Sequence, residues 1–174
     1  MFGLIKRVRV LDERMLAVML ERRHPRTERV MRIVTHLAHP LSAILFVGLM
    51  MCSRHPAVAT AGHQAAFALV ASHAFVQLFK RGIARPRPNL PAGRAPLMEA
   101  PDLFSFPSGH AAAALSIALP LAQTSPGGLG PIVLALAALV GFSRCFLGIH
   151  YPCDVLAGWA LAIAAHIFDI TTLP

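Results

Sequence analysis

Long stretches of this sequence carry almost no formal charge, and they set the expected architecture. Lys, Arg, Asp and Glu are absent from residues 33–53, 57–79 and 103–143, and only Asp169 falls within residues 155–170. A helix that spans a bilayer needs about 20 mostly apolar residues. Residues 123–131 divide the third stretch in two, because proline and glycine together break helices. The pattern predicts about five transmembrane helices, the last one completed by residues 152–174.

The first 32 residues show a different periodicity. Apolar residues recur at steps of three and four, and most arginines fall elsewhere on the helical wheel; the apolar positions are Leu4, Val8, Leu11, Met15 and Val18. This pattern indicates an amphipathic helix at the membrane interface, kinked or broken at Pro25. The alternative is a helix packed on its own protein. The expected fold is therefore an all-α, polytopic membrane bundle, with a basic amphipathic segment at residues 1–32 and a transmembrane domain at residues 33–174.

Composition supports a bilayer rather than a nucleic acid as the partner. Of 174 residues, 56% are hydrophobic and 14% are charged, against about 25% charged in typical soluble proteins. The net charge is +8, but nine of the sixteen Lys and Arg residues lie between Lys6 and Arg32. A basic segment that leads into apolar runs fits anionic lipid headgroups. No base-reading or stacking element accompanies it, which argues against a nucleic-acid-binding protein.

The remaining histidines and cysteines do not predict a metal site. His36 and His39 are one turn apart but have no third ligand nearby, and the cysteines form no CxxC pair; they are Cys52, Cys145 and Cys153. We interpret them as packed side chains.

Polar residues gather instead at the ends of the expected spans. Lys80 ends the second span, Ser108 opens the third and Arg144 ends the fourth. His150 and Asp154 open the fifth. Because consecutive spans run antiparallel, all of these positions, and Arg87 in the loop, fall on one side of the membrane. Ionisable residues in such surroundings are costly, which makes the cluster a candidate site.

The residue types in this cluster suit a phosphoryl group. Lys80, Arg87 and Arg144 supply positive charge from three elements. Ser108 is a predicted N-cap, and the helix start behind it, with the small Gly109, offers N–H groups to an anion. Asp154 can orient the imidazole of His150 so that its other nitrogen acts as a nucleophile.

Three motifs here resemble the type 2 phosphatidic acid phosphatase family, membrane relatives of the vanadium haloperoxidases. Its motifs are Lys-x6-Arg-Pro, Pro-Ser-Gly-His and Ser-Arg-x5-His-x3-Asp; here they run from Lys80 to Pro88, from Pro107 to His110 and from Ser143 to Asp154. The resemblance implies that His150 attacks phosphorus, Asp154 orients it and His110 protonates the leaving group. It also implies that the phosphoryl oxygens are bound by Lys80, Arg87, Ser108, Gly109 and Arg144, without a metal or another cofactor.

The expected function is thus a membrane lipid phosphatase that acts through a phosphohistidine on a phospholipid or isoprenyl phosphate or diphosphate. A phosphotransferase or lipid synthase, a vanadate-dependent haloperoxidase and a non-catalytic membrane protein are the alternatives. The positive-inside rule favours a site facing the cytoplasm of a bacterial inner membrane, and the outer face is the alternative. Membrane lipids are the expected partners.

Overall fold

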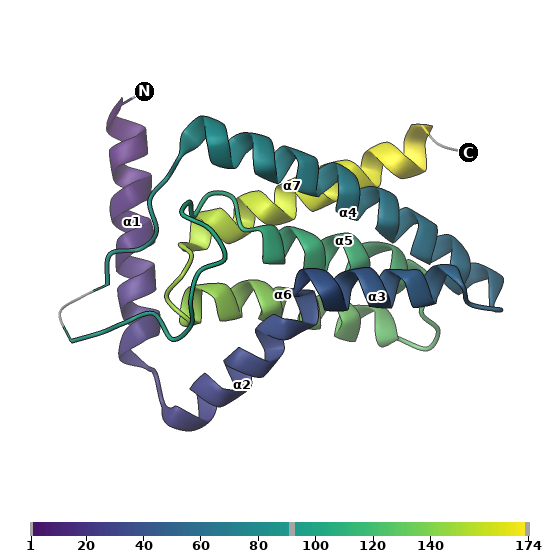
Figure 1. Ribbon diagram of the computed structural model, residues 1–174, viewed down its shortest axis with the longest axis horizontal. Helices are drawn as coiled ribbons and strands as arrows, with labels where there is room; N and C mark the ends of the chain where they lie inside the picture. Colours follow the sequence, from purple (N-terminus) through teal and green to yellow (C-terminus); the bar gives the residue numbers. More distant parts are fainter. Residues whose placement is uncertain (1, 91–92, 173–174) are drawn as a thin grey trace.

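The computed structural model describes residues 2–90 and 93–172, and within them every regular element is helical (Figure 1). The elements are α1 (Phe2–Glu21), α2 (Pro25–Thr35), the short 3-10 helix η1 (His36–Ala38), α3 (Pro40–Met51), α4 (Pro56–Ile83), α5 (Gly109–Thr124), α6 (Leu129–Phe146) and α7 (Pro152–Thr172). Proline is the first residue of four of these helices, where its missing N–H costs nothing. The all-α prediction is confirmed.

The central packing unit is α5, which contacts α4, α6 and α7. Its buried face is made of small residues, including Ala111, Ala112 and Ser116. The helix α4 also buries small residues, among them Ala65 and Ala68. Small residues let membrane helices approach closely. The hydroxyls of Ser72 and Ser116 are 3.1 Å apart and join α4 to α5.

The predicted first span differs from the structure. Residues 33–53 do not form one helix, because Pro40 lacks an N–H and holds the preceding His39 in an extended conformation. The residues 25–38 and the helix α3 meet instead at a bend of 53°.

Two helices, α6 and α7, are each long and apolar enough to cross a membrane, and the bent pair would add a third span if counted as one. The helix α5 has only 16 residues, and His63, Gln64, His73 and Gln77 lower the hydropathy of α4. The count of five spans therefore stays a prediction. The predicted breaks at Pro25 and after Thr124 are confirmed, and at the second break Gly128 adopts a positive φ of 81°.

The helix α1 lies crosswise at one end of the bundle (Figure 1). Its residues Leu16 and Leu20 are buried in a cluster with Tyr151 and Val155. The stripe expected from the sequence faces outward, since Val8, Leu11, Met15 and Val18 are exposed, while the side chain of Leu4 lies outside the described part. The helix α1 thus has one face packed on the bundle and an apolar stripe that is exposed, and its location at the membrane interface stays a prediction.

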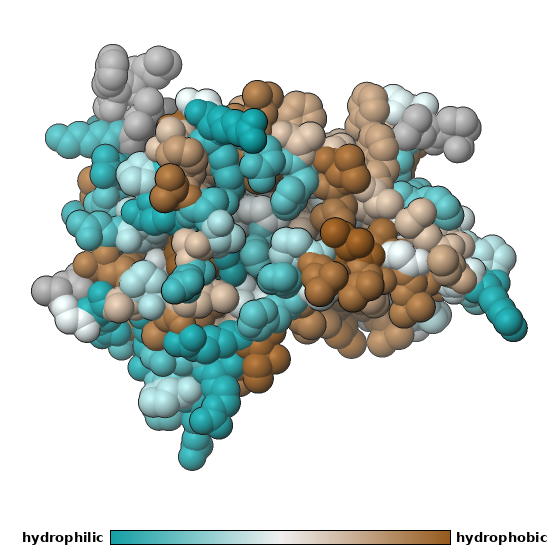
Figure 2. All heavy atoms as spheres, in the orientation of Figure 1, coloured by the Kyte–Doolittle hydropathy of each residue, from teal (hydrophilic) through white to brown (hydrophobic). Residues whose placement is uncertain are grey.

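The molecular surface has a hydrophobic part and a hydrophilic part. On the face shown in Figure 2, hydrophobic side chains gather over α3 and the neighbouring helices, and hydrophilic ones gather over α1, α2 and the loop between α4 and α5. The hydrophilic part lies at the end of the bundle that α1 covers.

Candidate active site

The motif residues lie together at the end of the bundle where α4 and α6 end and α5 and α7 begin. Each belongs to a helix terminus or to an adjacent loop: Lys80 and Arg144 are in last turns, Ser108 caps α5, and Asp154 is in the first turn of α7. The structure thus brings together residues up to 74 positions apart in sequence, from Lys80 to Asp154. Their chemical roles stay predictions.

His150 is buried in the turn between α6 and α7. The guanidinium Nη1 of Arg87 lies 2.9 Å from its Nε2. Since a guanidinium only donates, Nε2 must be the accepting nitrogen and the neutral ring carries its proton on Nδ1. Burial, and then the charges of Arg87, Arg144 and Lys80, hold the pKa of His150 well below its ordinary value. The lowered pKa favours the neutral ring, whose Nε2 lone pair is directed at Arg87.

Asp154 lies on the other side of the imidazole. Its Oδ2 is 3.4 Å from Nδ1 of His150 and accepts a hydrogen bond of 2.8 Å from the Tyr151 backbone N–H. Nδ1 itself has no hydrogen-bond partner within the described part of the chain. His150 and Asp154, the pair expected from the sequence, are thus adjacent without a hydrogen bond between them. Long catalytic contacts of this kind are common in unliganded sites.

The start of α5 supplies the third part of the site. The hydroxyl of Ser108 accepts from the Ala111 N–H at 3.4 Å, and the Ser108 N–H donates to the Asp154 carbonyl at 2.9 Å. Gly109 lies under His73, where an added Cβ would be 3.3 Å from the imidazole. These contacts fix the position of the helix terminus, whose positive dipole end favours an anion.

Arg144 does not reach the cavity in this structure. It is fully buried, and its Nη1 donates to Thr35 Oγ1 at 2.7 Å. Its Nε has no hydrogen-bond partner among residues 2–90 and 93–172. Arg144 therefore does not contact the cavity. It acts on His150 through its positive charge.

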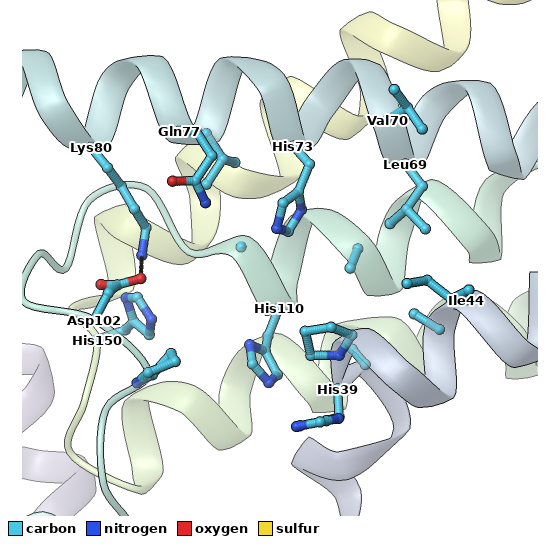
Figure 3. Close-up of a pocket in the computed structure, with 17 residues that line it drawn as sticks. His39, Ile44, Leu69, Val70, His73, Gln77, Lys80, Asp102, His110 and His150 are labelled. Carbon is cyan, nitrogen blue, oxygen red and sulfur yellow. Dashed lines mark hydrogen bonds and ion pairs between the residues drawn. The ribbon is translucent and has the colours of Figure 1, made fainter.

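A cavity of about 560 Å³ opens in front of these residues (Figure 3). Its lining changes in character along its length. Lys80, Asp102 and His150 lie at one end, followed by the polar side chains His39, His73, Gln77 and His110, and then by the apolar Ile44, Leu69 and Val70. The cavity thus runs from a charged end, through a polar belt, into an apolar groove between α3 and α4.

Asp102 is a site residue that the sequence did not predict. Its carboxylate accepts hydrogen bonds from Lys80 Nζ and, at 2.7 Å, from Arg87 Nη2. Burial raises the pKa of Asp102, but the contacts with Lys80 and Arg87 outweigh burial and leave that pKa below its ordinary value. The site therefore holds a second carboxylate besides Asp154, the one acidic residue that the three motifs supply. The charged carboxylate of Asp102 thus pairs with Lys80 and Arg87, the two cations that the resemblance assigns to binding phosphate.

Replacing Asp102 by asparagine is expected to strengthen anion binding. A neutral amide competes less well for Lys80 and Arg87, and one charge-assisted hydrogen bond corresponds to about tenfold in affinity. The measurement is the inhibition constant of inorganic phosphate or orthovanadate, which should fall about tenfold. Glu99→Gln, in the same loop, is the matched control. An unchanged or weaker inhibition in Asp102→Asn would contradict this competition.

The sequence profile of the PAP2 superfamily matches residues 61–172, a range that includes every motif residue. The chain belongs to the PAP2 superfamily. This membership confirms the resemblance to type 2 phosphatidic acid phosphatases that the three motifs indicate.

Curated relatives match the PAP2 chain over part of their length. Decaprenylphosphoryl-5-phosphoribose phosphatase of Mycobacterium tuberculosis is 42% identical over 90 residues, which are 52% of this chain and 49% of that protein. The chain thus spans about half the length of this relative.

Solved structures match over nearly all of the chain. The PAP2-type phosphatidylglycerolphosphate phosphatase of Bacillus subtilis, a transmembrane protein, has a TM-score of 0.75 and 28% identity, covering 95% of this chain and 87% of its own. LpxE of Aquifex aeolicus has a TM-score of 0.78 at 23% identity, covering 90% and 93%, and it shows the shared fold. With the apolar helices α6 and α7, these relatives identify the chain as an integral membrane protein.

Proposed function

We propose that this PAP2 protein hydrolyses a phosphomonoester or diphosphate of a phospholipid or isoprenyl lipid through a phosphohistidine, without a metal. The observation that carries the proposal is the placement of His150, whose unprotonated Nε2 faces Arg87 at one end of a cavity that becomes apolar at the other. A nucleophile, a cation pair and an apolar groove in this order suit an amphiphile with a terminal phosphoryl group. The relatives are phosphatases of lipid phosphates by name.

The first step forms a bond between Nε2 of His150 and phosphorus while the bond from phosphorus to the lipid oxygen breaks. His110, which lines the same cavity, gives its proton to that oxygen. The phosphoryl oxygens displace Asp102 from Lys80 and Arg87. They also accept hydrogen bonds from the backbone N–H groups at the start of α5. Asp154 balances the positive charge on the phosphorylated imidazole through Nδ1.

The second step returns the enzyme to its starting state. Water attacks phosphorus, His110 takes the proton of that water, and the phosphorus–nitrogen bond breaks. Nε2 regains its lone pair and inorganic phosphate leaves. The net reaction consumes one water and releases one phosphate for each lipid, and His110 ends each cycle with its proton.

The order of side chains along the cavity orients the substrate. With the phosphoryl group at Lys80, the tail extends toward Ile44 and Val70 between α3 and α4, and the linking atoms pass His73 and Gln77. Phosphatidic acid, phosphatidylglycerol phosphate, isoprenyl mono- and diphosphates and prenyl-linked sugar phosphates all have this layout.

The position of α1 bears on which membrane face holds the site. Its C-terminal end is tied to the site end of the bundle, where Arg23 donates to the Phe146 carbonyl at 2.9 and 2.7 Å. The basic N-terminal residues therefore lie on the side of the site, whatever the number of spans. The positive-inside rule favours basic segments in the cytoplasm, and on this basis we propose that the site faces the cytoplasm of a bacterial inner membrane, with the outer face as the alternative.

A panel of these lipid phosphates, presented in detergent to the purified protein, tests the function. We expect release of inorganic phosphate from at least one lipid without an added acceptor, unchanged in EDTA. Loss of activity in EDTA that Mg²⁺ restores would contradict the mechanism. Turnover that requires an acceptor would indicate a phosphotransferase, and bromide oxidation dependent on vanadate and peroxide would indicate a haloperoxidase.

A further inference from the structure

Asp12 on α1 is a buried carboxylate in a helix that carries none of the motifs. Its side chain is only 1% exposed, although α1 lies at the hydrophilic end of the molecule. A buried carboxylate is costly unless its oxygens are paired. Oδ2 accepts from Arg85 Nη2 at 2.7 Å, and Oδ1 accepts from the Cys153 backbone N–H at 2.9 Å. Both partners lie at the site end of the bundle, outside α1.

Arg85 connects Asp12 to the site. Its second branch, Nη1, donates to Oδ1 of Asp154 at 2.7 Å. The guanidinium is also stacked over the Tyr151 ring, 4.0 Å from the ring centroid. Because the guanidinium is a rigid planar fork, its two ion pairs and the ring together fix where it can lie. Asp12, Arg85 and Asp154 thus form a continuous chain of contacts that ends beside Nδ1 of His150.

This arrangement also sets the charge next to the nucleophile. Arg85 carries one positive charge and is shared between the carboxylates of Asp12 and Asp154. Without Asp12, the cation would pair with Asp154 alone and compete with His150 for it. With Asp12 present, the three groups carry a net negative charge. That charge favours a positive charge on the adjacent His150 ring, as in a phosphorylated imidazole.

We propose that Asp12 and Arg85 are a positioning pair for Asp154, which makes α1 part of the catalytic unit. The proposal rests on the phosphatase function proposed above. Neither residue touches the cavity end that holds the phosphoryl group, so both act through Asp154. The alternative is that the pair only anchors α1 to the bundle.

The test compares Asp12→Asn with two control variants in α1 and its C-terminal end. Asn has the shape of Asp but no charge, so we expect kcat to fall about 10- to 100-fold, as for supporting residues of other sites, with KM little changed. Glu13→Gln removes an exposed neighbouring acid that pairs with Arg9 and lies outside the Asp12–Arg85–Asp154 contacts. Arg23→Gln weakens the anchor at Phe146 without touching Asp154. Both controls should keep the wild-type kcat.

The decisive measurement is a double-mutant cycle with Asp154→Asn. If Asp12 acts through Asp154, Asp12→Asn lowers kcat in the wild type but adds little in the Asp154→Asn background. Additive effects, an unchanged kcat in Asp12→Asn, or an equal loss in Arg23→Gln would each overturn the proposal. If Asp12→Asn does not fold, Arg85→Lys tests the proposal instead, because lysine keeps the positive charge but lacks the planar fork. A wild-type kcat in Arg85→Lys would also overturn the proposal. His150→Ala, measured in parallel, reports on the phosphatase function separately.

Discussion

Replacing His150 by alanine is expected to reduce phosphate release from the best lipid substrate by about 10⁴-fold or more, since removal of a covalent nucleophile has effects of this order. Alanine removes Nε2, the atom that Arg87 contacts at 2.9 Å and that would form the bond to phosphorus in the proposed mechanism. The cavity and the cation pair remain, so lipid binding should persist. The measurement is phosphate released over time in detergent, together with binding of a lipid phosphate to the inactive variant.

His63→Ala is the matched control for this loss. His63 is an exposed histidine in the first half of α4, and its Nδ1 contacts the Ala59 carbonyl within the same helix. Its removal should leave turnover unchanged. Full activity of His150→Ala would disprove the phosphohistidine route, and so would a wild-type amount of protein-bound phosphate in that variant.

Replacing His110 by alanine is expected to slow hydrolysis of the lipid substrate by about 10² to 10⁴, the usual contribution of a general acid–base group. Lipid alkoxides are poor leaving groups, so the loss of the proton donor should be severe. An activated ester such as p-nitrophenyl phosphate needs no proton on its leaving group, and its first step should be much less affected.

The same variant separates the two steps of the mechanism. With the activated ester, water attack still lacks its base, so acid-labile phosphate should accumulate on the protein as a phosphohistidine. Equal losses for the lipid and the activated ester, with no bound phosphate, would show that His110 has another role. His73→Ala is the control, because His73 lines the same cavity one helix away.

The helices were largely readable from the sequence because local signals decide them. Prolines mark the helix starts, and the break after α5 follows from Pro126 and the glycines that follow it. The meeting of Lys80, Ser108, Arg144 and His150 was predictable as well, since alternating helix directions bring those ends together. The motif spacing then connected these ends to a known family, which the profile match confirms.

The features that the sequence did not predict have two causes. The bend before α3 is local, because Pro40 interrupts a run that by composition is apolar enough to be one span. The two unpredicted carboxylates depend on tertiary contacts. Asp102 and Asp12 lie outside every motif, and only the folded chain shows that one meets Lys80 and the other Arg85. Asp102 did have a signal, as one of two acids in a loop rich in cations.

The close contact between α5 and α7 has a mechanical consequence. Gly158 lies directly beneath the Ser108 carbonyl, where a Cβ would collide with the backbone, and the Ser108 N–H is bonded to the Asp154 carbonyl. These contacts hold the start of α5 and the backbone of Asp154 together. In the proposed mechanism, an opening that admits a lipid would come from the walls that lack these contacts, formed by α3, α4 and the loop that carries Asp102. Substrate entry and bond breaking would then be the tasks of different walls of one cavity.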